Sequence, residues 1–282
     1  DTWAGPRTTC PDYAPVDPEK DPPETVEHLR KAYAATLTMN DRRLGKLLDM
    51  MDRFNMWNDT AVVLTTDHGY LLGEHGLWAK NYPLAYDELV HLPLIIRHPD
   101  AKPGRRQALT HVTDIMPTLM DWHGACDMPG DVTGKSLTAL LQTDGHHHDA
   151  VLFGYFGREV GMTDGQYLYY RMPIPGSTCD LHFTNFSMTR KKNWAKAIPG
   201  VHLATAGGIP HFKVATPSHS ARNCDEKNVL FDLKADPEQA RPLVDAVLEG
   251  GLVAKLSGLL SEARAPDSQF ERLGVPVTRN ES

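Results

Sequence analysis

The chain has 282 residues and a formal net charge of −7, with 41% hydrophobic and 23% charged residues. This composition is typical of a globular protein with a buried core, and it excludes a disordered or fibrous chain. The acidic balance argues against nucleic-acid binding, which needs a clustered basic surface. No apolar run approaches the roughly 20 residues that a membrane-spanning helix requires. The sequence begins at Asp1 and shows no leader peptide, so a cytoplasmic and an exported location both stay open.

The first half of the chain alternates helical and strand patterns, as α/β proteins do. Residues 1–23 are rich in proline and predict an extended lead-in, because proline disfavours the helical conformation before it. A helix is predicted from near Glu24 to the polar residues 55–58, since apolar side chains recur at helical spacing. The apolar runs 61–66 and 92–97 predict buried parallel strands.

The helical apolar positions are Val26, Leu29, Tyr33, Leu37, Leu44, Leu47, Leu48, Met51 and Phe54.

A short helix is predicted at Thr113–His123, and the pattern changes after about residue 145. Short β-rich runs follow, and the Asp164-Gly165 pair between two of them predicts a hairpin. Residues 173–228 lack periodicity and predict a long loop excursion. A helix is expected from about Asp236 to Arg264, interrupted by its glycine pair. The predicted strands of this half are 150–156, 159–162, 166–172 and 228–233.

Three polar residues, Asp67, His68 and Gly69, come directly after the predicted strand 61–66. Ligands of open α/β sheets bind beyond the carboxyl ends of strands, and a carboxylate beside an imidazole suits a divalent cation. A capping aspartate with a packed histidine beside a turn glycine explains the same three residues. Taken alone, the tripeptide favours that structural interpretation.

The loop Gly73–Lys80 brackets an acidic residue and His75 between two glycines. Glycines at these positions indicate a tight backbone turn. Near a metal ion, the Lys80 ammonium would clamp the anionic oxygens of a sulfate or phosphate group. The structural alternative is a solvated surface lysine.

Five segments along the chain carry a family resemblance. The longest is Val62–Ile96, with the sequence VVLTTDHGYLLGEHGLWAKNYPLAYDELVHLPLII. The others are Tyr33–Leu48, Thr113–Leu119, Gly134–Leu137 and Leu230–Leu233 with the adjacent Asp236-Pro237-Glu238. Together they resemble, in order, segments of the sulfatase family in the alkaline phosphatase superfamily, from about Tyr33 to Leu243. Order and spacing are independent tests, so five matches are more specific than one.

The resemblance implies an α/β fold: the later part of an alkaline-phosphatase-like parallel-sheet sandwich. A smaller α+β domain with an antiparallel sheet comes after it. We therefore expect residues 1–145 to be the C-terminal part of the catalytic domain. Residues 146–282 would form the smaller domain, including the loop excursion.

The resemblance also implies roles for particular residues. Asp67 and His68 match metal ligands of the family, for which calcium is the usual ion; the histidine leaves manganese open. Lys80 matches the lysine that contacts the sulfate and assists the leaving group, and His75 is a further candidate for substrate binding. The implied activity is hydrolysis of a sulfate monoester, on a small molecule or a saccharide, by a formylglycine nucleophile.

The sequence departs from the family pattern at the nucleophile. No Cys or Ser stands in a C/S-x-P-x-R motif, and the early Asp-Asp pair is missing. We therefore expect the nucleophile in an N-terminal segment outside this sequence, and this chain alone to be inactive. That segment is an expected partner of the chain. Two alternatives stay open: a phosphonate or phosphodiester hydrolase of the same superfamily, and a non-catalytic fragment or binding protein on this half-fold.

Two groups of histidines stand apart from these motifs. The run His146-His147-His148 can bind metal, but its place between a turn and a predicted strand favours a solvated loop. The second group lies in the loop excursion, and one member could face the substrate, without a signal to choose which. Its members are His182, His202, His211 and His219.

Overall fold

The computed structural model describes residues 15–80, 84–125, 132–185, 191–203, 207–219 and 227–278. The chain divides into two compact units, Asp1–Pro103 and Gly104–Ser282, whereas the sequence predicts a boundary at residue 145. Residues 104–145 belong to the second unit and contact the residues that follow them in sequence. His111 Nε2 lies 2.7 Å from the Leu152 carbonyl oxygen, and Lys135 Nζ donates to the His147 carbonyl oxygen. Residues 1–14 of the predicted lead-in lie outside the described residues.

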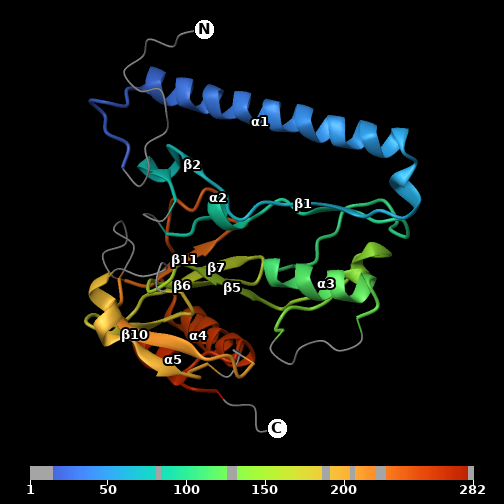
Figure 1. Cartoon of the computed structure of the whole chain (residues 1–282). Coiled ribbons are helices and arrows are strands. Elements are labelled where there is room, and N and C mark those ends of the chain that lie inside the picture. Colours follow the sequence, from blue (N-terminus) through green and yellow to red (C-terminus); the bar gives the residue numbers. More distant parts are fainter. Residues whose placement is uncertain are drawn as a thin grey trace. The chain divides into compact units, whose positions relative to one another are not determined.

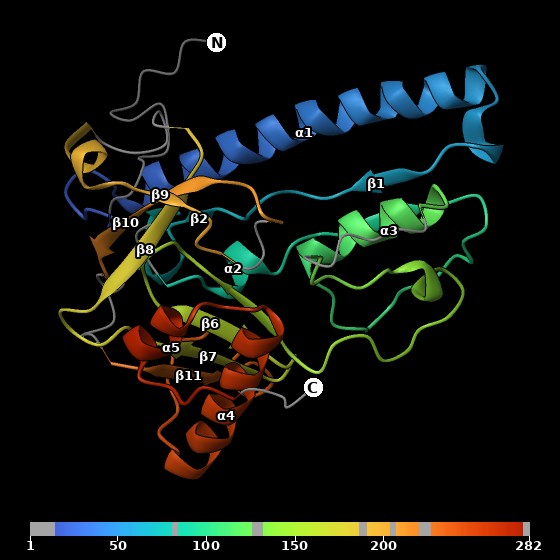
Figure 2. The ribbon, with the colours of Figure 1, turned by 60° about the horizontal axis from the view of Figure 1, so that its bottom comes forward.

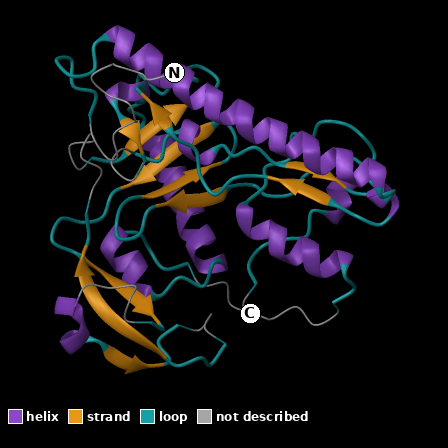
Figure 3. Cartoon of the chain, turned by 45° about the horizontal axis from the view of Figure 1, so that its top comes forward, coloured by secondary structure: helices purple, strands orange, loops and turns teal. Residues whose placement is uncertain are grey.

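The first unit begins with the long helix α1 (Pro23–Arg53), which runs without interruption (Figure 3). Its predicted start and end are confirmed: proline occupies the first turn, where its missing N–H costs nothing, and Asn55 turns the chain with a φ of 54°. The apolar stripe is mostly exposed, however. Leu29 and Met51 are buried, whereas Leu37 is 61% exposed and Leu47 49% exposed.

The strands β1 (Val62–Leu64) and β4 (Ile95–Arg97) pair with each other antiparallel, with Val63 opposite Ile96. The expectation of buried parallel strands at 61–66 and 92–97 is wrong for this pair. A parallel return needs a crossover connection of a dozen or more residues, which usually contains an α-helix. The helix found between them, α2 (Asp87–Val90), has four residues. Neither strand is fully buried, and Leu64 and Ile95 are exposed.

A tight hairpin lies between these strands in sequence. It is formed by β2 (Leu71–Leu72) and β3 (Trp78–Ala79), joined through the 3-10 turn η2 (Glu74–Gly76). The turn needs Gly73, whose φ is +100°. Figure 1 shows β2, α2 and β1 along the blue and teal part of the chain.

The second unit is built on a four-stranded antiparallel sheet in the order β11-β7-β6-β5. The sheet comprises β5 (Val151–Gly154), β6 (Val160–Thr163), β7 (Tyr167–Arg171) and β11 (Val229–Asp232). This confirms all four strands expected after residue 145, and the hairpin at Asp164-Gly165 joins β6 to β7.

Two helices cover this sheet, α4 (Ala246–Glu262) and α5 (Asp267–Leu273) (Figure 2). Their apolar side chains form one core with the sheet, in which Leu256, Leu273 and the strand residues Met162 and Tyr169 are fully buried. Successive side chains of a strand point to opposite faces, and Leu168, Tyr169 and Tyr170 of β7 are all fully buried, so both faces of the sheet are covered at this strand.

The helix predicted from Asp236 begins later than expected. Asp245 caps α4, and its Oδ1 accepts the N–H groups of Val247 and Leu248 at 3.0 and 2.9 Å. Pro242 disfavours the helical conformation at Arg241, the residue directly before it. The cap at Asp245 therefore sets where the helix begins. The glycine pair at 250–251 does not interrupt α4.

The first part of this unit holds the 3-10 turn η3 (Val112–Asp114), α3 (Ile115–Trp122) and the turn η4 (Thr138–Leu141). The helix predicted at Thr113–His123 is thus confirmed. Pro117 lies in the first turn of α3, where a proline can be accommodated.

The predicted loop excursion 173–228 contains a second sheet, which corrects that expectation. Its strands β8 (Thr178–Phe183), β9 (Ile198–Gly200) and β10 (His211–Pro217) pair antiparallel in the order β8-β10-β9, and the turn η6 spans Lys191–Lys196. Their short length and the prolines and glycines around them hid the period of two. Among the described residues, no helix is both long and apolar enough to cross a bilayer.

Candidate functional site

The end of β1 presents a carboxylate to solvent. The Asp67 side chain is 81% exposed, and its Oδ1 accepts the backbone N–H of His68 at 3.0 Å. Partial desolvation opposes ionisation, but the neighbouring His68 ring, backbone N–H groups and the Lys80 ammonium outweigh it and lower the pKa of Asp67. Asp67 is therefore an ionised carboxylate at neutral pH.

His68 is half-buried and fixed in one tautomer. Its Nδ1 lies 2.8 Å from the carbonyl oxygen of Gly69. Since a carbonyl oxygen only accepts, Nδ1 carries the hydrogen and the Nε2 lone pair is free for another group. That Nε2 contacts Nζ of Lys80 and lies 3.3 Å from Oδ2 of Asp67. The backbone thus directs the reactive nitrogen of His68 toward both other residues.

Gly69 allows the chain to turn after this pair. Its N–H donates to the Leu89 carbonyl oxygen at 2.9 Å. A Cβ at position 69 would lie 1.7 Å from the carbonyl oxygen of Glu88. The close approach of two backbone segments therefore requires glycine here, and it ties the end of β1 to α2.

Lys80 is placed by the hairpin that precedes it. Trp78 and Ala79 are fully buried and pack against Leu29 of α1, and Trp78 Nε1 donates to Oδ2 of Asp21 at 3.1 Å. Burying an indole whose N–H is satisfied fixes the strand firmly. The packing of this strand against the buried end of α1 thus fixes the position of Lys80 next to His68.

His75 makes contacts that shape the loop. Its ring stacks on Tyr86 at 3.6 Å between centroids, and its Nε2 lies 3.2 Å from Oε1 of Glu88. Its backbone has a φ of 55°. These contacts tie η2 to α2, while a direct role of His75 in substrate binding stays a prediction.

The three sequence-predicted residues Asp67, His68 and Lys80 therefore lie together. Asp67 Oδ2 and His68 Nε2 can serve as two ligands of one divalent cation. Calcium takes about six to eight oxygen ligands, so this pair fills only part of such a site. Among the described residues, a cluster of three metal-ligating groups occurs elsewhere, at Asp114, His147 and His148.

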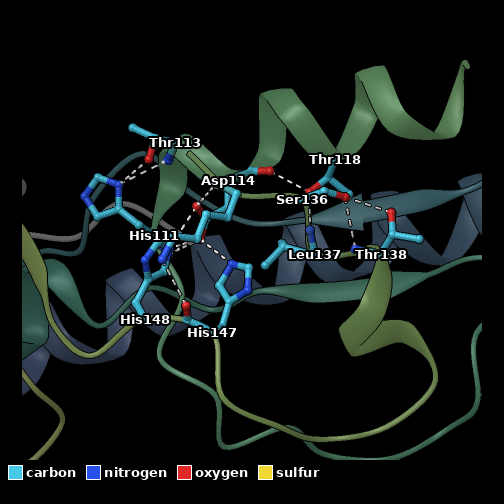
Figure 4. A network of polar contacts seen from close by, with 10 residues as sticks. His111, Thr113, Asp114, Thr118, Ser136, Leu137, Thr138, His147 and His148 are labelled. Atoms are coloured by element: carbon cyan, nitrogen blue, oxygen red, sulfur yellow. Dashed lines mark hydrogen bonds and ion pairs between the residues drawn. The ribbon is translucent and has the colours of Figure 1, made fainter. Parts of the chain in front are cut away.

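That second cluster corrects the interpretation of His146–His148 as a solvated loop. Nε2 of His147 and Nε2 of His148 lie 3.2 and 2.9 Å from Oδ2 of Asp114, whose side chain is fully buried (Figure 4). The two histidine side chains are only 9% and 12% exposed, whereas that of His146 is 70% exposed. The histidine tract is visible in the sequence, but no signal there joins it to Asp114, 33 positions away.

The structure also gathers histidines of the second sheet. The rings of His182 and His202 each lie 5.3 Å from that of His211, between centroids. Burial, with the charges of the other two, lowers the pKa of His182. Three of the four histidines that the sequence could not rank thus form one cluster within the second unit.

Comparison with known proteins connects the first site to a family. Residues 5–125 match the model of the Sulfatase family, a range that contains Asp67, His68, His75 and Lys80. An N-acetylglucosamine-6-O-sulfatase of Bacteroides thetaiotaomicron is 36% identical over 115 residues, which are 40% of this chain and 20% of that protein. A choline-sulfatase of Rhizobium meliloti is 37% identical over 102 residues, or 36% of this chain and 19% of that protein.

A solved structure shares the fold. It superposes with a TM-score of 0.65 at 20% identity and covers 90% of this chain and 44% of its own. That protein was solved in complex with its substrate, D-glucosamine-2-N,6-O-disulfate. The matched part of this chain thus spans about a fifth of the curated relatives and less than half of the solved one. The predicted α/β fold class and the family resemblance are both confirmed by these matches.

Proposed function

We propose that this chain, whose residues 5–125 match the model of the sulfatase family, carries part of the active site of an enzyme that hydrolyses sulfate monoesters. The observation that carries the proposal is the convergence of Asp67, His68 and Lys80 at the end of β1. A carboxylate, an imidazole lone pair and an ammonium in one place suit a cation and an anionic group bound side by side.

Asp67 and His68 would hold the divalent cation, calcium in the first instance and manganese as the alternative. When bound, the cation would supply charge that stabilises the oxygens of the transferred group. Asp67 is exposed and ionised, so its carboxylate is accessible to such an ion. The remaining ligands would come from residues outside this pair, because two atoms do not complete a calcium site.

Lys80 would bind the sulfate group and help the leaving oxygen depart. An ammonium carries three N–H donors. In the absence of a cation the His68 lone pair accepts one of them; a bound cation would take that lone pair and leave all three donors for sulfate oxygens. A positive charge held in place by the buried Trp78-Ala79 strand costs no reorganisation as negative charge builds up in the transition state.

The nucleophile would be a formylglycine contributed by a segment outside this sequence, since no Cys or Ser here stands in a C/S-x-P-x-R motif. A covalent step on such a group would split the hydrolysis into two easier steps. The same segment would cover the exposed apolar side chains of α1 and β1, among them Leu37 at 61% exposure and Leu64 at 39%. Without it, the chain would bind the cation weakly and would not turn over.

The substrate would be a sulfate ester on a saccharide or a small molecule. The fold relative bound to D-glucosamine-2-N,6-O-disulfate supports a sulfated saccharide, and the choline-sulfatase similarity supports the small-molecule class. Both share the sulfate monoester, which is the group that Lys80 and the cation would recognise.

The test measures how fast the protein that carries this chain hydrolyses two kinds of substrate. Its kcat/KM is measured for an aryl sulfate and for an aryl phosphodiester in the presence of calcium or manganese. Faster turnover of the sulfate supports the proposal. Equal or faster turnover of the phosphodiester would favour the phosphonate or phosphodiester hydrolase, and inactivity on both would favour a binding protein.

A further inference from the structure

A buried carboxylate in the second unit is surrounded by nitrogen atoms that the sulfatase site does not use. Asp114 stands at the junction of η3 and α3, and its side chain is fully buried. Its Oδ2 accepts the backbone N–H of His111 at 2.8 Å, and its Oδ1 accepts that of Lys135 at 2.9 Å. Two backbone segments therefore hold the carboxylate in one orientation.

Two neighbouring histidines converge on this carboxylate from the loop before β5. The Nε2 atoms of His147 and His148 lie 3.2 and 2.9 Å from Asp114 Oδ2, and their rings meet edge to face with centroids 4.6 Å apart. The loop is held on both sides, because Lys135 Nζ donates to the His147 carbonyl oxygen and Ala150 is buried in the sheet core. Both imidazoles reach the carboxylate with the same ring nitrogen (Figure 4).

We propose that Asp114, His147 and His148 form a zinc site that fastens the loop before β5 to the start of α3. All three ligand atoms lie within 4.8 Å of one another. In a tetrahedral site with zinc–ligand distances of about 2.0 Å, neighbouring ligand atoms are about 3.3 Å apart, close to the spacing of each imidazole from the carboxylate. A water molecule would take the fourth position.

The ligand types select zinc over harder cations. Two imidazoles and one carboxylate suit zinc, whereas calcium and magnesium prefer oxygen ligands alone. Backbone N–H groups already orient the carboxylate, as the outer shell of a metal site commonly does. In the zinc form both imidazoles would offer the Nε2 lone pair and keep their hydrogen on Nδ1. The competing arrangement is metal-free, with each Nε2 donating a hydrogen to the carboxylate.

The histidine tract supplies its own matched control. His146 is next to the two proposed ligands but its side chain is 70% exposed and meets Asp149 at 2.9 Å. The experiment purifies the protein that carries this chain without nickel affinity and equilibrates it with zinc. Bound zinc is then measured by elemental mass spectrometry in an Asp67→Asn background, which removes a ligand of the other cation site.

We expect the Asp67→Asn protein to retain about one equivalent of zinc and to melt at a higher temperature with zinc than after chelation. The added pair His147→Ala/His148→Ala should lose both the zinc and the shift, while the added His146→Ala should keep them. Asp114→Asn is less suitable, because it also weakens the acceptors of two backbone N–H groups. Equal zinc content in the double-histidine variant, or no zinc and no shift in its parent, would overturn the proposal. Neither result depends on sulfatase activity, so failure here leaves the proposed function untouched.

Discussion

The Nζ nitrogen of Lys80 contacts the Nε2 nitrogen of His68 across 12 positions of sequence. The contact exists because the hairpin of β2 and β3 folds back beside the end of β1, with Trp78 and Ala79 buried against α1. The hydrogen bond from His68 Nδ1 to the Gly69 carbonyl oxygen leaves a lone pair on the facing nitrogen. The fold of the hairpin and the tautomer of His68 therefore together place a lone pair opposite the Lys80 ammonium.

Gly69→Ala tests the backbone beneath the site. The new methyl group would lie 1.7 Å from the Glu88 carbonyl oxygen, so the backbone must move. We expect a loss of about 1–3 kcal/mol in the free energy of unfolding, measured by urea denaturation, and a lower kcat/KM. Gly45→Ala is the matched control: it lies within α1, its new Cβ meets nothing within 4 Å, and it should stabilise by about 0.5–1 kcal/mol. Equal effects of the two substitutions would contradict the role of the close approach.

Asp245→Ala tests why α4 begins where it does. The carboxylate accepts two N–H groups of the first turn, and removing it should destabilise the protein by about 1 kcal/mol. Asp245→Asn keeps a capping oxygen and should cost only a few tenths. Urea midpoints of both variants decide the matter, and an alanine variant as stable as the parent would show that another feature starts the helix.

Acid should destabilise the three-stranded sheet through His182. Burial lowers the pKa of this imidazole in the folded state, so the unfolded chain binds more protons over the range between the lowered value and about 6.5. Stability is therefore full above that range and falls as the pH drops through it.

The variant His182→Leu cannot titrate and should show a smaller loss of stability than the parent between about pH 7.5 and 5.5. Urea unfolding at the two pH values measures this loss. The control His146→Ala removes an exposed imidazole and should keep the parental dependence. An unchanged pH dependence in His182→Leu would refute the assignment.

Leu37→Glu tests whether the apolar stripe of α1 is covered in the protein that carries this chain. Leu37 is 61% exposed here, and an exposed site tolerates such a change within about 0.5 kcal/mol. If another segment covers it, the buried charge should cost at least about 2 kcal/mol. Val244, which is fully exposed, gives the control Val244→Glu. Thermal melts that are the same for both variants would count against a covering segment.

The sequence predicted the elements whose signals are local. The helix from Pro23 to Arg53, the β5–β7 meander and the hairpin at Asp164-Gly165 are consequences of periodicity and turn chemistry. The prediction failed where pairing depends on the whole chain. The antiparallel partnership of Val63 with Ile96 is set by the path of the connection, and a short apolar run reads the same in either orientation.

The candidate sites also divide into one with a local sequence signal and one that depends on the path of the whole chain. Asp67, His68 and Lys80 could be singled out as candidates because they lie within 14 residues of sequence whose pattern is specific, and their roles stay a prediction. His147 and Asp114 could not be joined, because their meeting depends on how the loop before β5 returns to α3. From the sequence alone, a histidine run beside a glycine turn is interpreted as a solvated loop, because its burial is not visible there.

The most direct test of the account is the kinetics of Lys80→Ala in the protein that carries this chain, with a sulfate ester as substrate. Loss of the ammonium should lower kcat/KM by about 10²–10³-fold without lowering the melting temperature. Asp67→Asn should lower it similarly, and Lys234→Ala, which removes an exposed lysine of the second unit, should leave it unchanged. A near-normal kcat/KM in Lys80→Ala would contradict the assignment of the site.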